Sequence, residues 1–82
     1  MFHPPRLLLI SCQVRVAHGS DADHFIQYIW VVDQAGAVVA AVELAPGDAP
    51  ALDFMVPKEA TSLAAFEACN LHGVWTSGPM AV

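Results

Sequence analysis

The chain has 82 residues, enough for one small domain, residues 1–82, whose folding hides about 60% of the surface of the unfolded chain. Its net charge is −5 and its only cations are Arg6, Arg15 and Lys58, which excludes nucleic acid, a partner bound mainly through lysine and arginine. Apolar residues make up 56% of the chain and charged residues 13%, too few charges to cover an ordinary monomer, so we expect a homo-oligomer.

Residues 7–16 are predicted to form the first strand. Apolar residues alternate with polar ones, and Cys12 falls on the apolar face with Val14 and Val16. The apolar run at residues 7–10 is far shorter than the roughly 20 residues of a membrane-spanning helix, and no signal-peptide pattern accompanies it. We therefore expect a cytoplasmic protein with no membrane partner, in which Cys12 is a core residue rather than half of a disulfide.

The middle of the chain is punctuated by turn residues. Aromatic and β-branched residues from 24 to 32 predict a second strand, and the polar residues 33–36 predict a turn into a return strand over residues 38–44. The proline- and glycine-rich residues 46–50 end that strand. A further short strand is predicted over residues 52–56.

Residues 58–68 are the one segment with helical character, because alanine is frequent there. We nevertheless predict a loop and then a strand over residues 63–68, since turn signals recur about every ten residues on both sides, the spacing of a β-sandwich. Residues 78–82 are expected to be a loosely held terminus. The pattern as a whole predicts an all-β fold.

Several conspicuous residues are expected to be structural. Large aromatic side chains supply much of the burial in a small sandwich, which predicts core or interface positions for Tyr28, Trp30, Phe54 and Trp75. No pair of carboxylates has a spacing that suggests acid and base catalysis, and solvated positions are expected for Glu43, Glu59 and Glu67.

The residues able to bind a metal are concentrated at turns. Cys69 and His72 lie three residues apart beside Gly73, a residue that permits backbone conformations other residues resist. His18 and His24 flank a polar loop upstream. Sulfur and imidazole ligands suit iron, copper or zinc and are poorly suited to magnesium or calcium. The sequence therefore predicts a transition-metal site.

Three segments, in this order and spacing, carry a more specific resemblance. His18 and His24 lead into the aromatic-rich strand, and the run Pro-Gly-Asp-Ala-Pro at residues 46–50 precedes Phe54. The run Cys-Asn-Leu-His-Gly-Val-Trp occupies residues 69–75 without interruption. Together they resemble the superoxide reductase family, the iron domain of neelaredoxin and desulfoferrodoxin. The resemblance covers most of the chain.

The resemblance implies a single desulfoferrodoxin-like iron-binding domain over residues 1–82, folded as an immunoglobulin-like β-sandwich. It implies one mononuclear non-haem iron with four imidazole ligands and one axial thiolate, assigned here to His3, His18, His24, His72 and Cys69. The implied activity is the reduction of superoxide to hydrogen peroxide at the iron position opposite the thiolate. Cys69 is therefore the candidate catalytic residue, since a thiolate donates electron density to the metal.

The chain departs from the family just before the first ligand. The family has a lysine there, which attracts the anionic substrate, and this chain has Phe2. Electrostatic focusing raises on-rates about 10- to 1,000-fold, so Phe2 predicts a slow enzyme unless Arg6 or Lys58 supplies the charge. The short segment before His3 leaves no place for the small rubredoxin-like iron domain of some relatives, so we expect a separate electron donor such as a rubredoxin.

Three alternatives stay open. A cupredoxin-like electron carrier would use His24, Cys69, His72 and Met80, although Met80 lies eight residues after His72, farther than compact copper loops place it. A closed tetrahedral zinc site would use His18 with His24, Cys69 and His72. The third alternative is a β-sandwich without turnover, whose apolar surface serves assembly.

Overall fold

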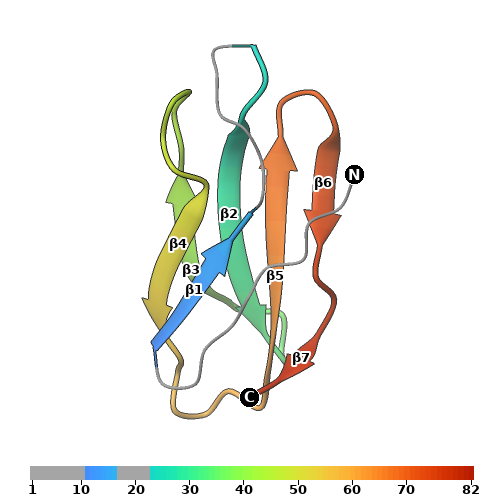
Figure 1. Cartoon of the computed structure of the whole chain (residues 1–82). Helices are drawn as coiled ribbons and strands as arrows, with labels where there is room; N and C mark the ends of the chain where they lie inside the picture. The colour runs from blue at the N-terminus through green and yellow to red at the C-terminus, as the bar shows by residue number, and fades with distance from the viewer. Residues whose placement is uncertain (1–10, 17–22) are drawn as a thin grey trace.

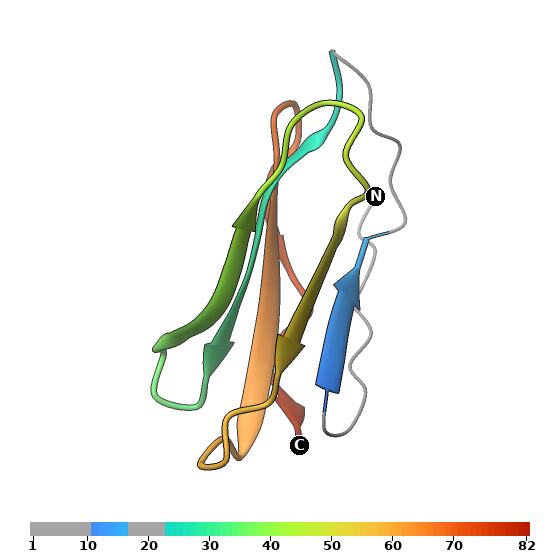
Figure 2. The same ribbon diagram turned by 90° about the vertical axis from the view of Figure 1, so that its left-hand side faces the viewer.

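The chain folds as two antiparallel β-sheets packed face to face (Figures 1 and 2). The computed structural model describes residues 11–16 and 23–82, apart from the side chains of Ser11 and Cys12. One sheet pairs β1 with β4, and the other has the order β3-β2-β5-β6 with β7 also beside β5. The strands are β1 (Ser11–Arg15), β2 (Ile26–Asp33), β3 (Val38–Glu43), β4 (Ala51–Met55), β5 (Ser62–Cys69), β6 (Gly73–Thr76) and β7 (Met80–Ala81).

The two-layer arrangement confirms the predicted all-β class and the immunoglobulin-like β-sandwich. The described part of the chain contains no helix, and so none that could cross a membrane. Strands β2 to β5 lie within two residues of their predicted bounds. The first strand was predicted to begin earlier than Ser11, at residue 7, and residues 7–10 lie outside the described residues.

The alanine-rich sequence before Cys69 is compatible with a helix or a strand, and in the structure it forms strand β5. Its residues alternate between half-buried and buried along the whole strand, with Leu63, Ala65, Glu67 and Cys69 facing inward. A period of two is the mark of a strand with one face on a core. The predicted strand over residues 63–68 is therefore confirmed, and the helix propensity of its alanines is overridden by sheet pairing on both edges.

Glu67 was expected to be solvated, and that prediction was wrong. Its side chain is only 5% exposed, because the alternation along β5 turns it to the inward face with Cys69. Glutamate is rarely buried, so residue type alone favours the surface.

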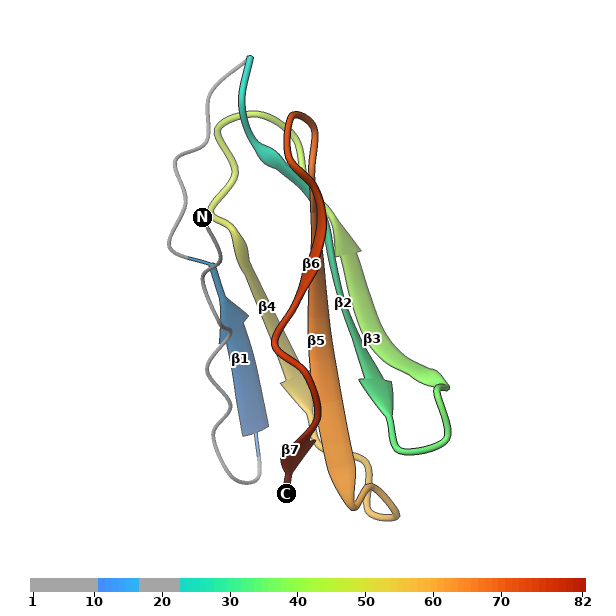
Figure 3. The same cartoon turned by 90° about the vertical axis from the view of Figure 1, so that its right-hand side faces the viewer.

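The loosely held terminus was a second wrong prediction. Met80 pairs with Leu63 and Ala81 with Ser62, and the amide of Val82 donates a 3.2 Å hydrogen bond to the Thr61 carbonyl. Strand β6 pairs only with the second half of β5, and after β6 the chain follows β5 to its first half (Figure 3). The uncovered edge of β5 therefore orders the segment.

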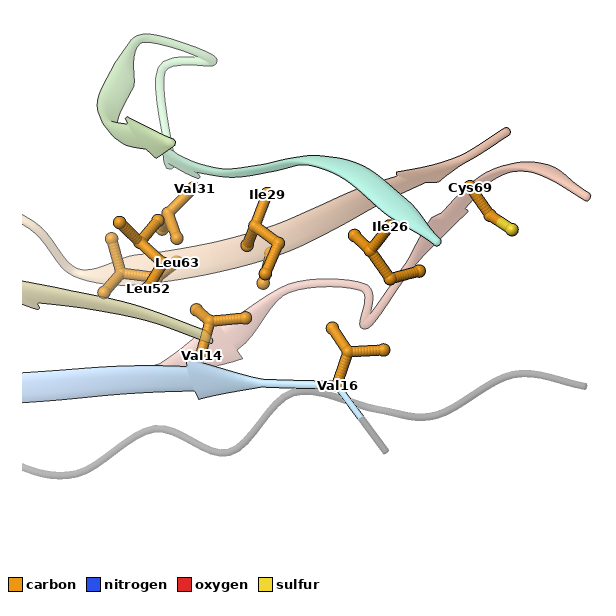
Figure 4. Packing of buried hydrophobic residues seen from close by; sticks show 9 residues of the cluster. Val14, Val16, Ile26, Ile29, Val31, Leu52, Leu63 and Cys69 are labelled. Atoms are coloured by element: carbon orange, nitrogen blue, oxygen red, sulfur yellow. The ribbon is translucent and has the colours of Figure 1, made fainter. Parts of the chain in front are cut away.

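The core lies between the two sheets (Figure 4). Val14 of β1 and Leu52 of β4 face Ile29 and Leu63 of the larger sheet, and three of these four are fully buried. Each fully buried aliphatic side chain contributes about 1.5–3 kcal/mol. Cys69 lies at one end of the cluster, beyond Ile26, so the core leads directly to the thiol.

Replacing Ile29 with alanine is expected to lower the free energy of unfolding by about 2–5 kcal/mol, through lost apolar burial and the cavity left behind. Ile29 is 0% exposed. Met55→Ala is the control, because Met55 is 64% exposed on β4, and it should change stability by less than about 0.5 kcal/mol. Urea unfolding followed by tryptophan fluorescence measures both. A loss for Ile29→Ala no larger than that of the control would contradict the core described here.

Candidate metal centre

Three potential ligands meet at one end of the sandwich. The ligand atoms of His24, Cys69 and His72 all lie within 4.8 Å of one another. The Cys69 Sγ is 3.9 Å from the His72 Nδ1, and the rings of His24 and His72 meet edge to face with centroids 4.7 Å apart. Cys69 is buried, His24 is half-buried and His72 is exposed. The Cys69 thiol therefore lies at the buried end of the site, and the His72 imidazole lies on its solvent-exposed side.

The β5–β6 hairpin places Cys69 and His72. Cys69 ends β5 and pairs with Gly73, the first residue of β6, so only three residues form the loop. Gly73 has a φ of +79°, in the left-handed region where glycine is unstrained and where three-residue hairpin loops need a residue. The Trp75 Nε1 donates a 3.1 Å hydrogen bond to the His72 carbonyl and braces the loop.

His24 comes from a segment distant in sequence. It lies two residues before β2, whose first residue, Ile26, pairs with Cys69. The start of β2 and the β5–β6 loop therefore lie at the same end of the sheet (Figure 1). Phe25 and Asn70 exchange hydrogen bonds between the two segments, at 2.9 and 3.2 Å.

The three donors fit a transition-metal ion. Metal–nitrogen bonds of about 2.1 Å and metal–sulfur bonds of about 2.3 Å place ligand atoms on one ion roughly 3–4.5 Å apart. The separations in the site are at most 4.8 Å, so small side-chain rotations bring all three atoms to one ion. A thiolate with imidazoles suits iron, copper or zinc.

The structure brings together three of the five predicted ligands, His24, Cys69 and His72. The other two, His3 and His18, lie outside the described residues. They therefore stay predictions.

The cupredoxin-like ligand set is wrong, because Met80 pairs with Leu63. Leu63 precedes Cys69 by six residues along β5, which separates Met80 from the thiol by about 20 Å. Lys58 also lies away from the site, in the loop before β5, at the opposite end of the sheet from Cys69 (Figure 1). It therefore does not replace the charge of the family's lysine.

Sequence reasoning missed three residues around the site. Asn70 makes side-chain hydrogen bonds to the His24 segment, Trp75 braces the loop, and Glu67 is buried on the same face of β5 as Cys69. A weak signal existed for Asn70, because asparagine at turns often bonds to nearby backbone. Trp75 was assigned to a core or an interface, and it is 36% exposed beside the loop that it braces.

Cys69→Ala is expected to abolish the thiolate-to-metal absorption of the cobalt(II)-loaded protein. Loss of an outer-shell partner costs about 10- to 100-fold in metal affinity, so loss of this ligand should cost at least about 100-fold. The chain's other cysteine offers a matched control, and Cys12→Ala should keep both absorption and affinity. Optical titration with cobalt(II) measures the two variants. Loss of the absorption in Cys12→Ala rather than in Cys69→Ala would contradict the site.

The chain is similar to known proteins over most of its length. The family model for desulfoferrodoxin matches residues 7–78. A desulfoferrodoxin homolog from Archaeoglobus fulgidus is 40% identical over 63 residues, which cover 77% of this chain and 47% of that protein. The desulfoferrodoxin of Nitratidesulfovibrio vulgaris is 42% identical over 60 residues, which cover 73% and 44%. The chain thus spans about half the length of the curated relatives it matches.

Solved structures share the fold. A superoxide reductase (1Fe-SOR) from Giardia intestinalis superimposes with a TM-score of 0.82 at 24% identity, covering 98% of this chain and 97% of that one. The superoxide reductase of Treponema pallidum gives a TM-score of 0.73 at 30% identity, covering 90% and 63%. With a family model matched over most of its length and sequence relatives at 40% identity, this chain belongs to the desulfoferrodoxin family.

Proposed function

We propose that the chain binds one mononuclear non-haem iron and reduces superoxide to hydrogen peroxide. The observation that carries the proposal is the convergence of His24, Cys69 and His72 within 4.8 Å, in a chain of the desulfoferrodoxin family. Structural neighbours named superoxide reductase support the same activity. His3 and His18 are proposed as the two further imidazole ligands.

Each residue of the site has a distinct part in this chemistry. Iron bound here would supply one electron to superoxide, which with two protons would become hydrogen peroxide, and a separate donor such as a rubredoxin would restore the ferrous state. The buried Cys69 would be its electron-rich sulfur ligand, shielded from water. His24 and His72 would hold the ion through neutral ring nitrogens. His72 and Leu71 are exposed, so a small anion reaches the site from solvent and water supplies the protons.

The electrostatics favour a slow reaction. The chain carries a net charge of −5, and Lys58 lies at the far end of β5 from Cys69. Superoxide is an anion, and with Phe2 in place of the family's lysine and Lys58 remote from Cys69, the site loses one source of the focusing that raises on-rates about 10- to 1,000-fold. We therefore propose that association with superoxide limits turnover.

Protein purified without added metal is expected to contain about one iron per chain, through the ligand set proposed above, and to show a thiolate-to-iron(III) band after oxidation. Pulse-generated superoxide should then react with the ferrous protein faster than with free iron(II). The thiolate band should be lost in Cys69→Ala. Stoichiometric zinc without colour, or an intense blue copper band, would contradict the iron site, and a rate no faster than free iron(II) would contradict the activity.

We further propose that two copies of this chain associate through the outer face of the larger sheet. The outer face comprises the side chains directed away from the core, and strand register assigns to it Tyr28, Trp30, Val32, Val38, Ala41, Glu43, Ala64, Phe66, Ala68, Val74 and Thr76. Glu43 is its only charged member. Strand β5 thus carries no charged side chain on its outer face, and Glu67 is the only charged residue on its inner face, a composition typical of a strand covered on both sides.

A second copy suits the outer face better than a charged partner does. The rings of Trp30 and Phe66 stack with an interplanar angle of 8° and present a flat apolar surface. Four strands of four to eight residues, about 4.8 Å apart and rising about 3.3 Å per residue, cover about 400 Å². Two copies would therefore bury on the order of 800 Å², the size of a weak, transient interface.

Val38→Lys is expected to shift the protein to monomers, because a charge would be buried between two outer faces. Val38 is 61% exposed in a single copy, so the fold should tolerate the change. Met55→Lys is the matched control, since Met55 is 64% exposed but lies on the other sheet. Sedimentation velocity over a range of concentrations measures both. Equal dissociation of the two variants, or a monomeric wild-type protein, would contradict the interface.

A further inference from the structure

We propose that Asn70 is a positioning residue, whose side chain holds His24 against Cys69 and His72. The inference rests on the metal site proposed above and concerns how the apo chain prepares it. Three hydrogen bonds of Asn70 reach the segment that contains His24, at 2.9, 3.2 and 2.9 Å.

His24 needs such a residue because the regular sheet ends before it. The last ladder pair between β2 and β5 at this end joins Ile26 to Cys69. The register is irregular between Ile26 and Tyr28, so strand pairing constrains the backbone of the preceding residues less. His24 lies two residues beyond that pair, outside any strand. Strand pairing alone therefore does not fix its position.

Asn70 extends the ladder by one pair with its side chain. Its main-chain amide donates to the Phe25 carbonyl, and its side-chain Oδ1 accepts from the Phe25 amide. In a regular antiparallel pair the second bond goes to a main-chain carbonyl. The side-chain carbonyl replaces that group where the chain already turns toward His72. The pairing therefore continues through the point at which the hairpin loop begins.

The third hydrogen bond fixes the backbone on the other side of His24. The Asn70 Nδ2 donates to the Asp23 carbonyl at 2.9 Å, so Asp23 and Phe25, the two neighbours of His24, are both tied to one side chain. Fixing both neighbours leaves His24 little more than its side-chain torsions. Asn70 also connects the His24 segment to the thiol. It follows Cys69 directly, and its Oδ1 lies 4.0 Å from the Cys69 Sγ.

Asparagine suits this position chemically. The three bonds require one acceptor and one donor at the end of a short side chain, together with the main-chain amide. Aspartate keeps the acceptor for the Phe25 amide and loses the donor to Asp23. Alanine loses both. The two substitutions therefore divide the role into its parts.

Cobalt(II) titration of Asn70→Ala is the test. Affinity is expected to fall about 10- to 100-fold, the usual cost of losing a residue that orients a metal ligand. The d–d bands should shift as the His24 contact is lost, while the Cys69 thiolate band remains. In the metal-free protein, amide hydrogen exchange at Phe25 should become faster, because its acceptor is the Asn70 side chain. Asn70→Asp should fall between Asn70→Ala and wild type in both measurements.

Gln34→Ala is the matched control. Gln34 is also an exposed amide that joins two backbone segments, accepting from the Thr61 amide at 3.0 Å and donating to the Glu59 carbonyl at 3.4 Å. It lies just after the end of β2 opposite His24, so its loss should leave cobalt affinity and spectrum unchanged. Wild-type affinity and spectrum in both Asn70 variants would overturn the inference and leave the proposed function intact.

A wild-type protein that binds no metal would overturn the proposed function instead. Hydrogen exchange in the metal-free protein would then decide whether Asn70 holds the segment. Exchange at Phe25 that is the same in Asn70→Ala and Gln34→Ala would overturn the inference on its own.

Discussion

The pairing of Cys69 with strands on both of its sides is the constraint on which the site depends. Cys69 pairs with Ile26 of β2 on one edge of β5 and with Gly73 of β6 on the other. Side chains alternate along a strand, so the buried series in β5 turns the thiol into the sandwich. The segments that carry His24 and His72 both depart from these two pairs. The register of one residue therefore places Cys69 and His72 and brings the segment that carries His24 beside them.

Alternation and turn chemistry made most of the sheet predictable, and the two errors have physical causes. Local pattern locates a strand when its residues alternate over several positions, as they do in β5. Strand β7 has only two residues, and it forms because β6 leaves the first half of β5 uncovered. Glu67 is buried because its place in the alternation outweighs the preference of its residue type. The first outcome depends on a strand distant in sequence, and the second on a conflict between local alternation and residue type.

The candidate site was predictable to different degrees. Cys69 and His72 lie three residues apart beside a glycine, so the local sequence already places them on one turn. His24 lies 45 residues before Cys69, and ligand chemistry together with the family resemblance, rather than any local spacing, associated the two. Asn70 stands in the same run of residues, but its role depends on which backbone it meets in space. A side-chain bond to distant backbone leaves no periodic trace in a sequence.

Cys69 belongs both to the core and to the ligand set, so metal binding would also constrain the unfolded chain. An ion held by His24 and Cys69 would join residues 45 positions apart, as a covalent cross-link does. In the chain-entropy treatment, closing a loop of that length disfavours the unfolded ensemble by about 4 kcal/mol. That gain is comparable to the total stability of a small domain. Metal loss would then reopen the loop, and chelation would act on the folding equilibrium as directly as on the chemistry.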